Sequence, residues 1–277
     1  MISGRSVIVV VPAFEEESLV GGVVRTMPSF VDRILVVDDG SGDRTSAEAR
    51  ASGDPRVEVI RHHQRRGVGA AIATGYRFAL GVTNHPNDVI AVMAGDGQMD
   101  PSDLERVVLP IVRGEADYVK GDRFLNSATR PSMGLPRWIG GQVFSRLTAL
   151  AIGQPISDSQ CGFTAIAHRA VRAIELDRMW PSFGYPNDLL GILAAKRFRI
   201  AEVPVRAVYG TERSKMRLRH LPPIFFLVAR AAVRRRRSHP FGEGACAPTS
   251  TYHPGETGCE RRAPPPVPSA PPQASEP

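Results

Sequence analysis

The chain has 277 residues, of which 42% are hydrophobic and 23% charged, and its net charge is +7. This is the composition of an ordinary globular protein, and the length allows one large domain or two small ones. No run of 18 apolar residues and no leader pattern is present, so the sequence predicts neither a membrane-spanning helix nor a secretory signal. The three cysteines show no metal-ligand spacing and favour a reducing compartment.

Strand-like and helix-like segments alternate from Val7 to Val112. We expect strands at Val7–Val11, Ile34–Val37, Val57–Ile60 and Asp88–Met93. Helices are expected between and after them, at Glu16–Met27, Thr45–Ala51, Gly69–Leu80 and Ser102–Val112. Ser102, with Glu105 three residues later, has the pattern of a capping box. The alternation predicts an α/β fold, Rossmann-like, with a mostly parallel sheet and flanking helices.

The composition changes near Ser238. Before it, Leu221–Arg237 combines an apolar run with four consecutive arginines. After it, Pro, Gly, Ser and Ala dominate, and the apolar content is too low for a packed core. We therefore expect a folded domain over residues 1–219, a basic amphipathic segment over 220–237 and a disordered Pro-rich tail over 238–277.

Two adjacent carboxylates, Asp38 and Asp39, follow the second expected strand directly. Open α/β sheets bind ligands at the carboxyl ends of their strands, where a carboxylate suits a ribose, a base or a phosphate-bound divalent cation. A helix cap is the simpler interpretation for Asp43. For Asp38 and Asp39 we favour ligand binding, because neighbouring like charges repel unless something binds them.

A second polar cluster follows the fourth expected strand, where Asp96 and Gln98 alternate around Gly97. A carboxylate and an amide oxygen form a partial shell for Mg²⁺ or Mn²⁺, which phosphate oxygens and water complete. A turn before the next helix would account for Asp100 and Pro101, but it gives no reason for an acid at Asp96. We therefore expect a divalent-metal site at Asp96 and Gln98.

Dinucleotide binding is a rival interpretation of the alternating pattern. It requires Gly-x-Gly-x-x-Gly after the first strand, but that strand runs here into Pro12-Ala13-Phe14-Glu15-Glu16. Gly67-Val68-Gly69, after the third strand, is compatible with a ligand contact and equally with a tight strand-to-helix turn.

An ordered set of motifs resembles those of the family 2 glycosyltransferases, and specifically their dolichol-phosphate mannosyltransferase-like branch. The matching segments are Val11-Pro12-Ala13-Phe14-Glu15-Glu16, Asp38-Asp39-Gly40-Ser41-Gly42-Asp43-Arg44-Thr45, Gly67-Val68-Gly69-Ala70, Asp96-Gly97-Gln98, Gly121-Asp122-Arg123-Phe124, Asp158-Ser159-Gln160-Cys161-Gly162-Phe163 and Ile200-Ala201-Glu202-Val203-Pro204-Val205. The likeness covers roughly residues 5 to 215.

The resemblance implies a GT-A fold, a nucleotide-sugar donor and an inverting transfer, with residues 1–219 as the catalytic domain. It implies donor contacts at Pro12, Glu15, Asp38, Asp39, Gly67, Gly69 and Asp96, and a Mg²⁺ or Mn²⁺ ion at Asp96 and Gln98. Ala94 stands where the family often has Asp, and Glu15 where it has Asn. These departures leave the base and the sugar of the donor open.

Arg123 and Arg137 are the residues expected at an acceptor phosphate, since a guanidinium presents a planar fork to such a group. A surface salt bridge for Arg123 and a charged helix start for Arg137 are the alternatives. Asp158 and Asp188 are, with Arg123, the catalytic candidates. A hydroxyl acceptor needs a base, whereas a lipid phosphate is already anionic and needs none. Asp188 could equally complement a helix dipole.

The segment Leu221–Arg237 is too short to span a bilayer. Ile224–Val228 is apolar and Arg234–Arg237 is basic, which favours an interfacial helix on anionic headgroups over a core helix with a solvated basic end. No nucleic-acid-binding motif accompanies the arginines, so we expect no nucleic-acid partner. The expected location is cytoplasmic and peripheral, at the inner face of the cell membrane.

The resemblance implies an inverting transfer of a hexose from a nucleotide sugar to an acceptor, which, with the basic apolar segment, we expect to be a polyprenyl phosphate at the cytoplasmic membrane face. A saccharide or small-molecule hydroxyl is the alternative acceptor. Ala94 also suggests a non-catalytic sugar-nucleotide-binding protein, but the joint presence of Asp38, Asp96, Arg123 and Asp158 argues for catalysis.

Overall fold

The computed structural model describes residues 1–125, 135–206, 208 and 221–238. Residues 239–277, for which we expect a disordered tail, lie outside the described residues. The boundary expected between residues 219 and 220 lies outside them as well.

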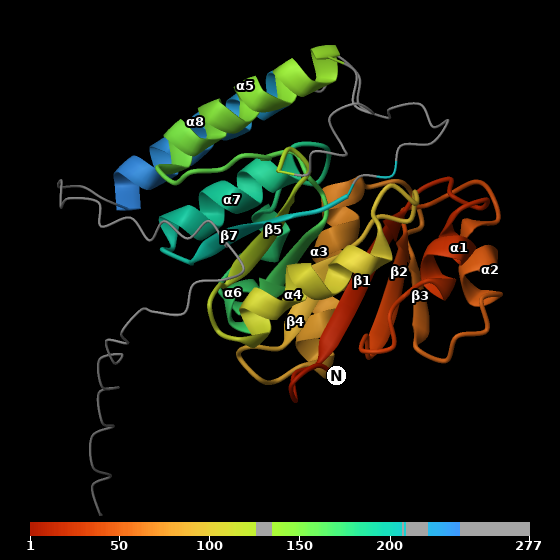
Figure 1. Cartoon of the computed structure of the whole chain (residues 1–277). Coiled ribbons are helices and arrows are strands. Elements are labelled where there is room, and N and C mark those ends of the chain that lie inside the picture. Colours follow the sequence, from red (N-terminus) through yellow and green to blue (C-terminus); the bar gives the residue numbers. More distant parts are fainter. Residues whose placement is uncertain (126–134, 207, 209–220, 239–277) are drawn as a thin grey trace, which may run out of the picture.

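A seven-stranded sheet forms the centre of the protein, with the strand order β3-β2-β1-β4-β6-β5-β7 (Figure 1). The strands are β1 (Val7–Ala13), β2 (Arg33–Asp38), β3 (Val57–Arg61), β4 (Val89–Val92), β5 (Tyr118–Asp122), β6 (Thr164–Ala167) and β7 (Ile200–Pro204). β6 runs antiparallel to β4 and β5, and the other pairs are parallel. The α/β fold with a mostly parallel sheet is confirmed.

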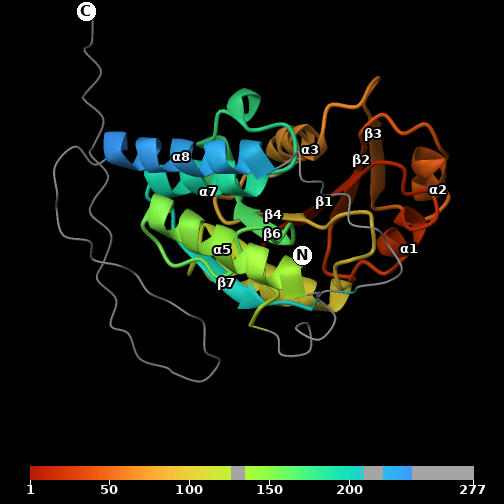
Figure 2. The ribbon, with the colours of Figure 1, turned by 90° about the horizontal axis from the view of Figure 1, so that it is seen from above.

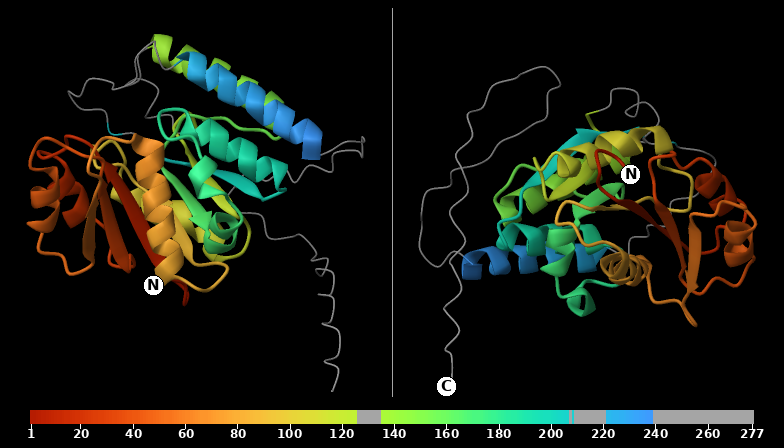
Figure 3. Two further views of the ribbon diagram at one scale, coloured as in Figure 1. Left: turned by 180° about the vertical axis from the view of Figure 1, so that it is seen from behind. Right: turned by 90° about the horizontal axis from the view of Figure 1, so that it is seen from below.

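Helices cover both faces of this sheet. They are α1 (Val20–Arg25), α2 (Thr45–Arg50), α3 (Val68–Val82), α4 (Leu104–Val112), α5 (Leu135–Ile152), α6 (His168–Arg172), α7 (Tyr185–Ala195) and α8 (Leu221–Ser238), with short 3-10 helices η1 (Pro101–Asp103) and η2 (Leu176–Arg178). Opposite views show α4 in front of one face and α3 in front of the other (Figures 1 and 3). Helices α5 and α8 lie side by side as an outer layer next to α7 (Figure 2).

The core forms because the strands are apolar on both sides. Every residue of β1 is buried, as expected for a parallel strand covered by helices on both faces. Helix α3 approaches β1 closely through small residues, since a Cβ at Gly75 would lie 2.3 Å from Val10 Cγ1. The Ala- and Gly-rich face of this helix therefore allows a closer contact than larger side chains would.

Two local expectations are corrected by the structure. Helix α1 begins at Val20 rather than at Glu16, because the preceding backbone binds the turn after β2: the Glu16 N–H donates to Thr45 Oγ1 at 2.9 Å and the Glu17 N–H to Asp43 Oδ2 at 3.2 Å. The capping box at Ser102 is not formed. Instead, the Asp100 carboxylate accepts the Ser102 N–H at 2.9 Å, and η1 precedes α4.

Strand direction brings the predicted motifs to one edge of the sheet. The parallel strands β2, β4 and β5 end there, at Asp38, Val92 and Asp122, and the antiparallel β6 begins there. The segments that follow β2, β4 and β5 and the loop that precedes β6 are therefore neighbours, although more than a hundred residues separate the first from the last.

Candidate active site

Asp38 closes the turn that follows β2. It is fully buried; Oδ1 accepts the Ser41 N–H at 2.8 Å, and Oδ2 accepts the Ser46 hydroxyl. Burial by itself would raise the pKa of Asp38, but these hydrogen bonds and the charge of Arg61 outweigh it, and the pKa lies below its usual value. Asp38 is therefore an ionised group whose partners lie within the chain.

Asp39 connects the end of β2 to the glycine turn before α3. Its Oδ1 accepts the Arg66 N–H at 2.8 Å and lies 2.8 Å from His62 Nδ1, and its Oδ2 accepts the Gly67 N–H at 2.7 Å. The two neighbouring charges of Asp38 and Asp39 are thus compensated internally, so their repulsion does not require an external ligand. The donor contacts expected for both residues stay predictions.

Gly67 and Gly69 pack against the backbone of the segment Trp180–Ser182. Gly67 has a φ of 102°, and a Cβ there would lie 2.4 Å from the carbonyl oxygen of Pro181. A Cβ at Gly69 would lie 2.1 Å from the carbonyl oxygen of Trp180. The Ala70 N–H donates to that Pro181 oxygen at 3.0 Å. The turn geometry explains Gly67 and close packing against this backbone explains both glycines, so a donor contact at either stays a prediction.

Pro12 and Glu15 lie at the end of β1, next to the Asp38 turn. Pro12 is paired in register with Val37, and the Glu15 N–H donates to Ser41 Oγ at 3.0 Å. Glu15 has a φ of 55°, a left-handed conformation that Asn adopts more readily than Glu. The Asn of the resembling family thus fits this backbone better than the Glu found here.

Asp96 and Gln98 lie on the loop after β4, where both are half-buried. The Gln98 N–H donates to Asp96 Oδ1 at 3.1 Å. Over the described residues, no group of three or more His, Cys, Asp or Glu side chains could hold a metal ion. A single carboxylate with an amide still fits Mg²⁺ or Mn²⁺, because such ions are commonly bound by one or two carboxylates together with substrate phosphates and water.

Arg123 and Asp158 form a bidentate ion pair beyond the end of β5. Arg123 Nε lies 2.7 Å from Asp158 Oδ2, and Nη2 lies 2.9 Å from Oδ1. Asp158 is fully buried and also accepts the N–H groups of Gln160 and Cys161. Burial alone would raise the pKa of Asp158, but the adjacent Arg123 guanidinium holds it below its usual value. The carboxylate is thereby committed to orienting Arg123.

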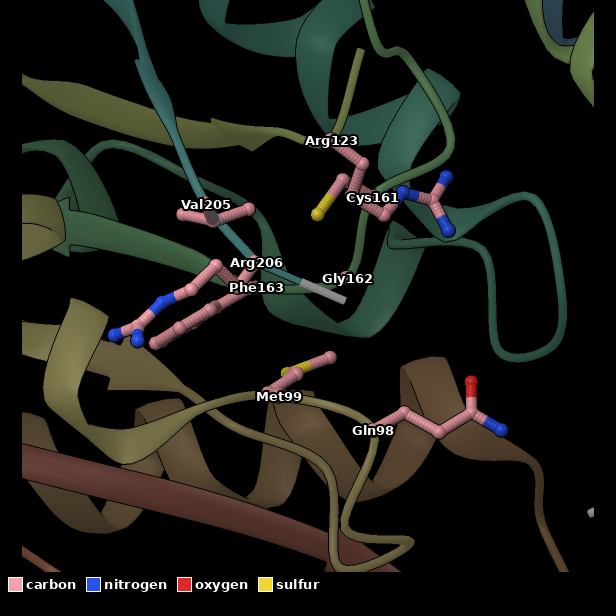
Figure 4. A pocket seen from close by; sticks show the side chains of 8 residues that line it. All are labelled: Gln98, Met99, Arg123, Cys161, Gly162, Phe163, Val205 and Arg206. Atoms are coloured by element: carbon pink, nitrogen blue, oxygen red, sulfur yellow. The ribbon is translucent and has the colours of Figure 1, made fainter. Parts of the chain in front are cut away.

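The Arg123 side chain lines a small, open pocket. The other lining residues are Gln98, Met99, Cys161, Gly162, Phe163, Val205 and Arg206. Arg123 and Gln98 extend to the same side from opposite walls, whereas Arg206 points away from them (Figure 4). The pocket thus joins the predicted metal loop to the predicted phosphate-binding arginine.

A layer of ionisable residues that contact the Asp158 loop was given no role from the sequence: Lys120, which is buried, and Glu202, which is half-buried. Glu202 of β7 accepts the N–H groups of Ser157 at 2.7 Å and Asp158 at 3.0 Å. Lys120 of β5 is fully buried, and its Nζ donates to the Cys161 carbonyl. These residues hold the loop that carries Asp158. A lysine directly after the apolar pair Tyr118-Val119 was the available signal.

Burial displaces the pKa values of this layer. It lowers the pKa of Lys120 and raises that of Glu202. Burial also raises the pKa of Asp122, and the charge of Asp158 adds to that rise. The predicted Gly121-Asp122-Arg123 and Asp158 motifs are therefore electrostatically coupled, because the charge of Asp158 acts directly on Asp122.

Asp188 lies in the first turn of α7 and is fully buried. Its Oδ1 accepts hydrogen bonds from Arg230 and Arg234 of α8, the latter from Nη1 at 2.5 Å, and its Oδ2 accepts the Trp180 N–H at 2.8 Å. We therefore revise its role from work on the acceptor to docking of α8. Arg137 lies in the first turn of α5, and its side chain is outside the described part of the structure.

The arginines that end α8 do not act as one group. Arg234 binds Asp188, and Arg235 donates to the Leu150 carbonyl at 3.1 Å. Arg236 and Arg237 are exposed. The expectation that all four face anionic headgroups is therefore corrected, because tertiary contacts engage the first two.

Helices α5 and α8 expose several large apolar side chains, which we together call the apolar face. On α8, Phe225 is 51% and Phe226 56% exposed; on α5, Leu150 is 75% exposed, and the same two helices also expose Ile139, Val143 and Val233. The inner side of α8 is buried through Ile224, Leu227 and Ala231. Among the described helices, none is both long enough and apolar enough to cross a bilayer.

Comparison with known proteins identifies the family. A model of glycosyl transferase family 2 matches residues 8–174. The chain belongs to glycosyl transferase family 2. Polyprenol monophosphomannose synthase of Mycolicibacterium smegmatis is 30% identical over 242 residues, covering 83% of this chain and 88% of that protein. The UDP-N-acetylglucosamine–dolichyl-phosphate N-acetylglucosaminyltransferase of Methanococcus voltae is 28% identical over 233 residues, covering 78% and 90%.

Solved structures show the fold. Glucosyl-3-phosphoglycerate synthase from Mycobacterium tuberculosis, in complex with Mn²⁺ and UDP-glucose, matches with a TM-score of 0.60 at 20% identity, covering 87% of this chain and 81% of that chain. The fold is GT-A, as the motifs implied. The protein is a nucleotide-sugar glycosyltransferase with polyprenyl-phosphate glycosyltransferases among its relatives.

Proposed function

We propose that this glycosyltransferase transfers a hexose, with inversion, from a nucleotide-diphosphate sugar to a polyprenyl phosphate at the cytoplasmic face of the membrane. The main support is the state of its two candidate bases. Asp158 and Asp188 are both fully buried and both bonded to arginines. A hydroxyl acceptor needs a base, but a lipid phosphate is an anion and can attack without one.

On the donor side, Asp96 and Gln98 would hold Mg²⁺ or Mn²⁺ with the diphosphate. When bound, the ion neutralises the charge that grows on the leaving nucleoside diphosphate. The loops that Asp38 and Asp39 hold in place would position the base and the ribose, beside Pro12, Glu15 and the Gly67–Gly69 turn. Structural neighbours that contain Mn²⁺ together with UDP-glucose support this assignment.

On the acceptor side, Arg123 would bind the lipid phosphate in the pocket that it lines, with Arg137 as a second candidate. Its ion pair with Asp158 fixes the plane of the guanidinium before the acceptor arrives. An oxygen of the phosphate then attacks the anomeric carbon as the bond from that carbon to the diphosphate breaks on the opposite side. No proton is transferred, and the single displacement inverts the anomeric configuration.

The apolar face of α5 and α8 supports a membrane-bound acceptor. Both helices lie beyond the sheet edge at which β1 and β2 end, the edge that holds the site (Figure 1). The exposed Phe225 and Phe226 supply apolar area, and Arg236 and Arg237 add attraction to anionic lipid of about 1 kcal/mol each. Such a surface binds reversibly rather than inserting across the bilayer.

An acceptor panel tests the proposal. Nucleotide sugars would be offered with Mn²⁺ or Mg²⁺ and with a polyprenyl phosphate, the matching polyprenol or a free saccharide. We expect product only when the acceptor is the polyprenyl phosphate, and NMR of that product should show an inverted anomeric centre. Equal transfer to the polyprenol or the saccharide would overturn the phosphate-acceptor assignment.

The metal site is tested by Asp96→Ala. We expect turnover to fall by at least about a hundredfold, because the leaving diphosphate loses its counter-ion, and calorimetry should show weaker Mn²⁺-dependent UDP binding. Asp100→Ala is the matched control, since it removes a carboxylate from the same loop that pairs with Arg206 instead. Unchanged turnover by Asp96→Ala in the presence of a chelator would refute the site.

A further inference from the structure

A continuous set of contacts joins α8 to the donor side of the site. Arg230 and Arg234 bind Asp188 Oδ1, and Asp188 Oδ2 accepts the Trp180 N–H at 2.8 Å. The next residue, Pro181, accepts the Ala70 N–H at 3.0 Å. We call these contacts the α8 relay.

The relay ends at a turn that is held from two sides. The segment Trp180–Ser182 lies against Gly67 and Gly69 so closely that neither position has room for a Cβ. From the other side, Asp39 accepts the N–H groups of Arg66 and Gly67 at 2.8 and 2.7 Å. The position of this turn, and of Asp39 with it, therefore depends on where Trp180–Ser182 lies.

The other end of the relay reaches the apolar face. Phe226 is 56% exposed, and its ring centroid lies 6.5 Å from that of Trp180 and 5.9 Å from the Arg230 guanidinium carbon. Helix α8 is also packed rigidly on α7, because a Cβ at Gly191 would lie 2.7 Å from that of Ala231. A displacement of α8 would thus be transmitted to Trp180 through both an ion pair and a ring contact.

We propose that α8 is a positioning element for donor binding: through Asp188 and Trp180–Ser182, it holds the Gly67–Gly69 turn in the geometry that binds the nucleotide. This role has a consequence for regulation, which rests on the proposed membrane association. When the apolar face docks on lipid, α8 is held in place and donor binding becomes tighter. By linkage, bound nucleotide must then tighten membrane binding by the same factor.

The relay is broken without leaving a buried charge in the triple variant Asp188→Asn, Arg230→Met and Arg234→Met. Replacing a buried ion pair by neutral groups is commonly neutral for stability, so this variant should stay folded. We expect its Kd for UDP with Mn²⁺, or for GDP where wild type prefers it, to rise at least about fivefold without lipid. Hydrogen exchange in the Arg66–Ala71 segment should accelerate.

The matched control is Arg236→Gln with Arg237→Gln, which removes two exposed charges from the same helix. It should leave the nucleotide Kd and the exchange of Arg66–Ala71 unchanged while weakening sedimentation with phosphatidylglycerol vesicles. The triple variant should still bind those vesicles, because its arginines face Asp188 in the wild type. The two variants thus separate the relay from membrane attachment.

Each outcome of these experiments bears on a different part of the proposal. A folded triple variant with the wild-type nucleotide Kd and exchange overturns the relay, as does an equal Kd change in the control. Failure of wild type to bind the vesicles overturns the membrane part of the proposed function and leaves the lipid-free test of the relay intact. Where the triple variant melts early, Trp180→Ala tests the ring-contact branch of the relay, because it removes the contact with Phe226 and keeps the backbone N–H bond to Asp188. The same fivefold criterion applies to that branch.

Discussion

Asp158 and Asp188 have similar surroundings but different roles: one orients a residue of the site, and the other docks a helix. Each is a fully buried aspartate that accepts hydrogen bonds from arginine and from a backbone N–H. The arginine of Asp158 comes from the end of β5 and lines the pocket, so that pair shapes the site. The arginines of Asp188 come from α8, so that cluster fastens a helix. The origin of the arginine, rather than the carboxylate, decides the role.

The two outer helices, α5 and α8, show a matching division. Helix α5 holds the loop that carries Asp158, since Ser145 Oγ accepts the Ser159 N–H at 2.9 Å. Helix α8 holds the segment Trp180–Ser182 through Asp188. Asn187, next to Asp188, accepts hydrogen bonds from Thr148 of α5 and from Gln160 of the Asp158 loop. The start of α7 is therefore in contact with both the Asp158 loop and α5.

The sharpest test of this comparison replaces each aspartate by Asn. Asp158→Asn should lower turnover on the order of a hundredfold, because a misplaced Arg123 no longer meets the acceptor phosphate. At saturating donor, Asp188→Asn should keep turnover within about fivefold of wild type while losing about 1.5–3 kcal/mol of unfolding free energy, since two half-buried arginines lose their charge-assisted hydrogen bonds to Asp188. Steady-state kinetics and denaturant titration measure both. Equal kinetic losses would erase the distinction.

A smaller effect is expected from Arg123 itself. Arg123→Ala should raise the acceptor KM by roughly 10- to 100-fold and leave the donor KM nearly unchanged, as for the loss of a charged contact of about 1.5–3 kcal/mol. Arg123→Lys should recover only part of this, because an ammonium cannot present the guanidinium fork. Unchanged acceptor kinetics in both variants would show that Arg123 does not bind the acceptor and is only a structural partner of Asp158.

The smallest effect concerns Asp122, the buried acid beside Asp158 that pairs with no cation among the described residues. Burial, with the charge of Asp158, raises its pKa, so the ionised form destabilises the fold. Asp122→Asn should therefore add on the order of 1 kcal/mol of stability at neutral pH. The gain should vanish as pH falls through the folded pKa toward the unfolded value of about 3.9, where wild-type Asp122 is protonated. Melting temperatures across that range check the sign.

Asp158 has the opposite pH dependence, which separates the two acids. Arg123 holds its pKa below the unfolded value, so its stabilising contribution is present above the unfolded pKa and is lost as pH falls through the folded pKa. Asp158→Asn should therefore differ most from wild type at neutral pH and least in acid, as a loss of stability where Asp122→Asn shows a gain.

The sequence by itself determined the strands and helices up to Val112 and the edge of the sheet at which chemistry is expected. Apolar runs such as Val7–Val11 and Ile34–Val37 form buried strands wherever they lie, and parallel strands end at one edge. Asp38 and Asp96 stand at or just beyond strand ends and were found from local pattern, whereas Arg123 was found through its likeness to a family motif. The predicted start of α1 was wrong because the backbone N–H groups of Glu16 and Glu17 donate to a hydroxyl and a carboxylate that are distant in the sequence.

Tertiary structure decided what each charged residue does. Asp158 and Arg123 are 35 positions apart, and Asp188 and Arg230 are 42 apart, so no local pattern pairs them. Lys120 and Glu202 likewise gain their roles only when β5 and β7 lie side by side. A buried charge must find its counter-charge across the fold, because desolvation makes an unpaired ion too costly. Which partner it meets depends on how the helices and strands pack.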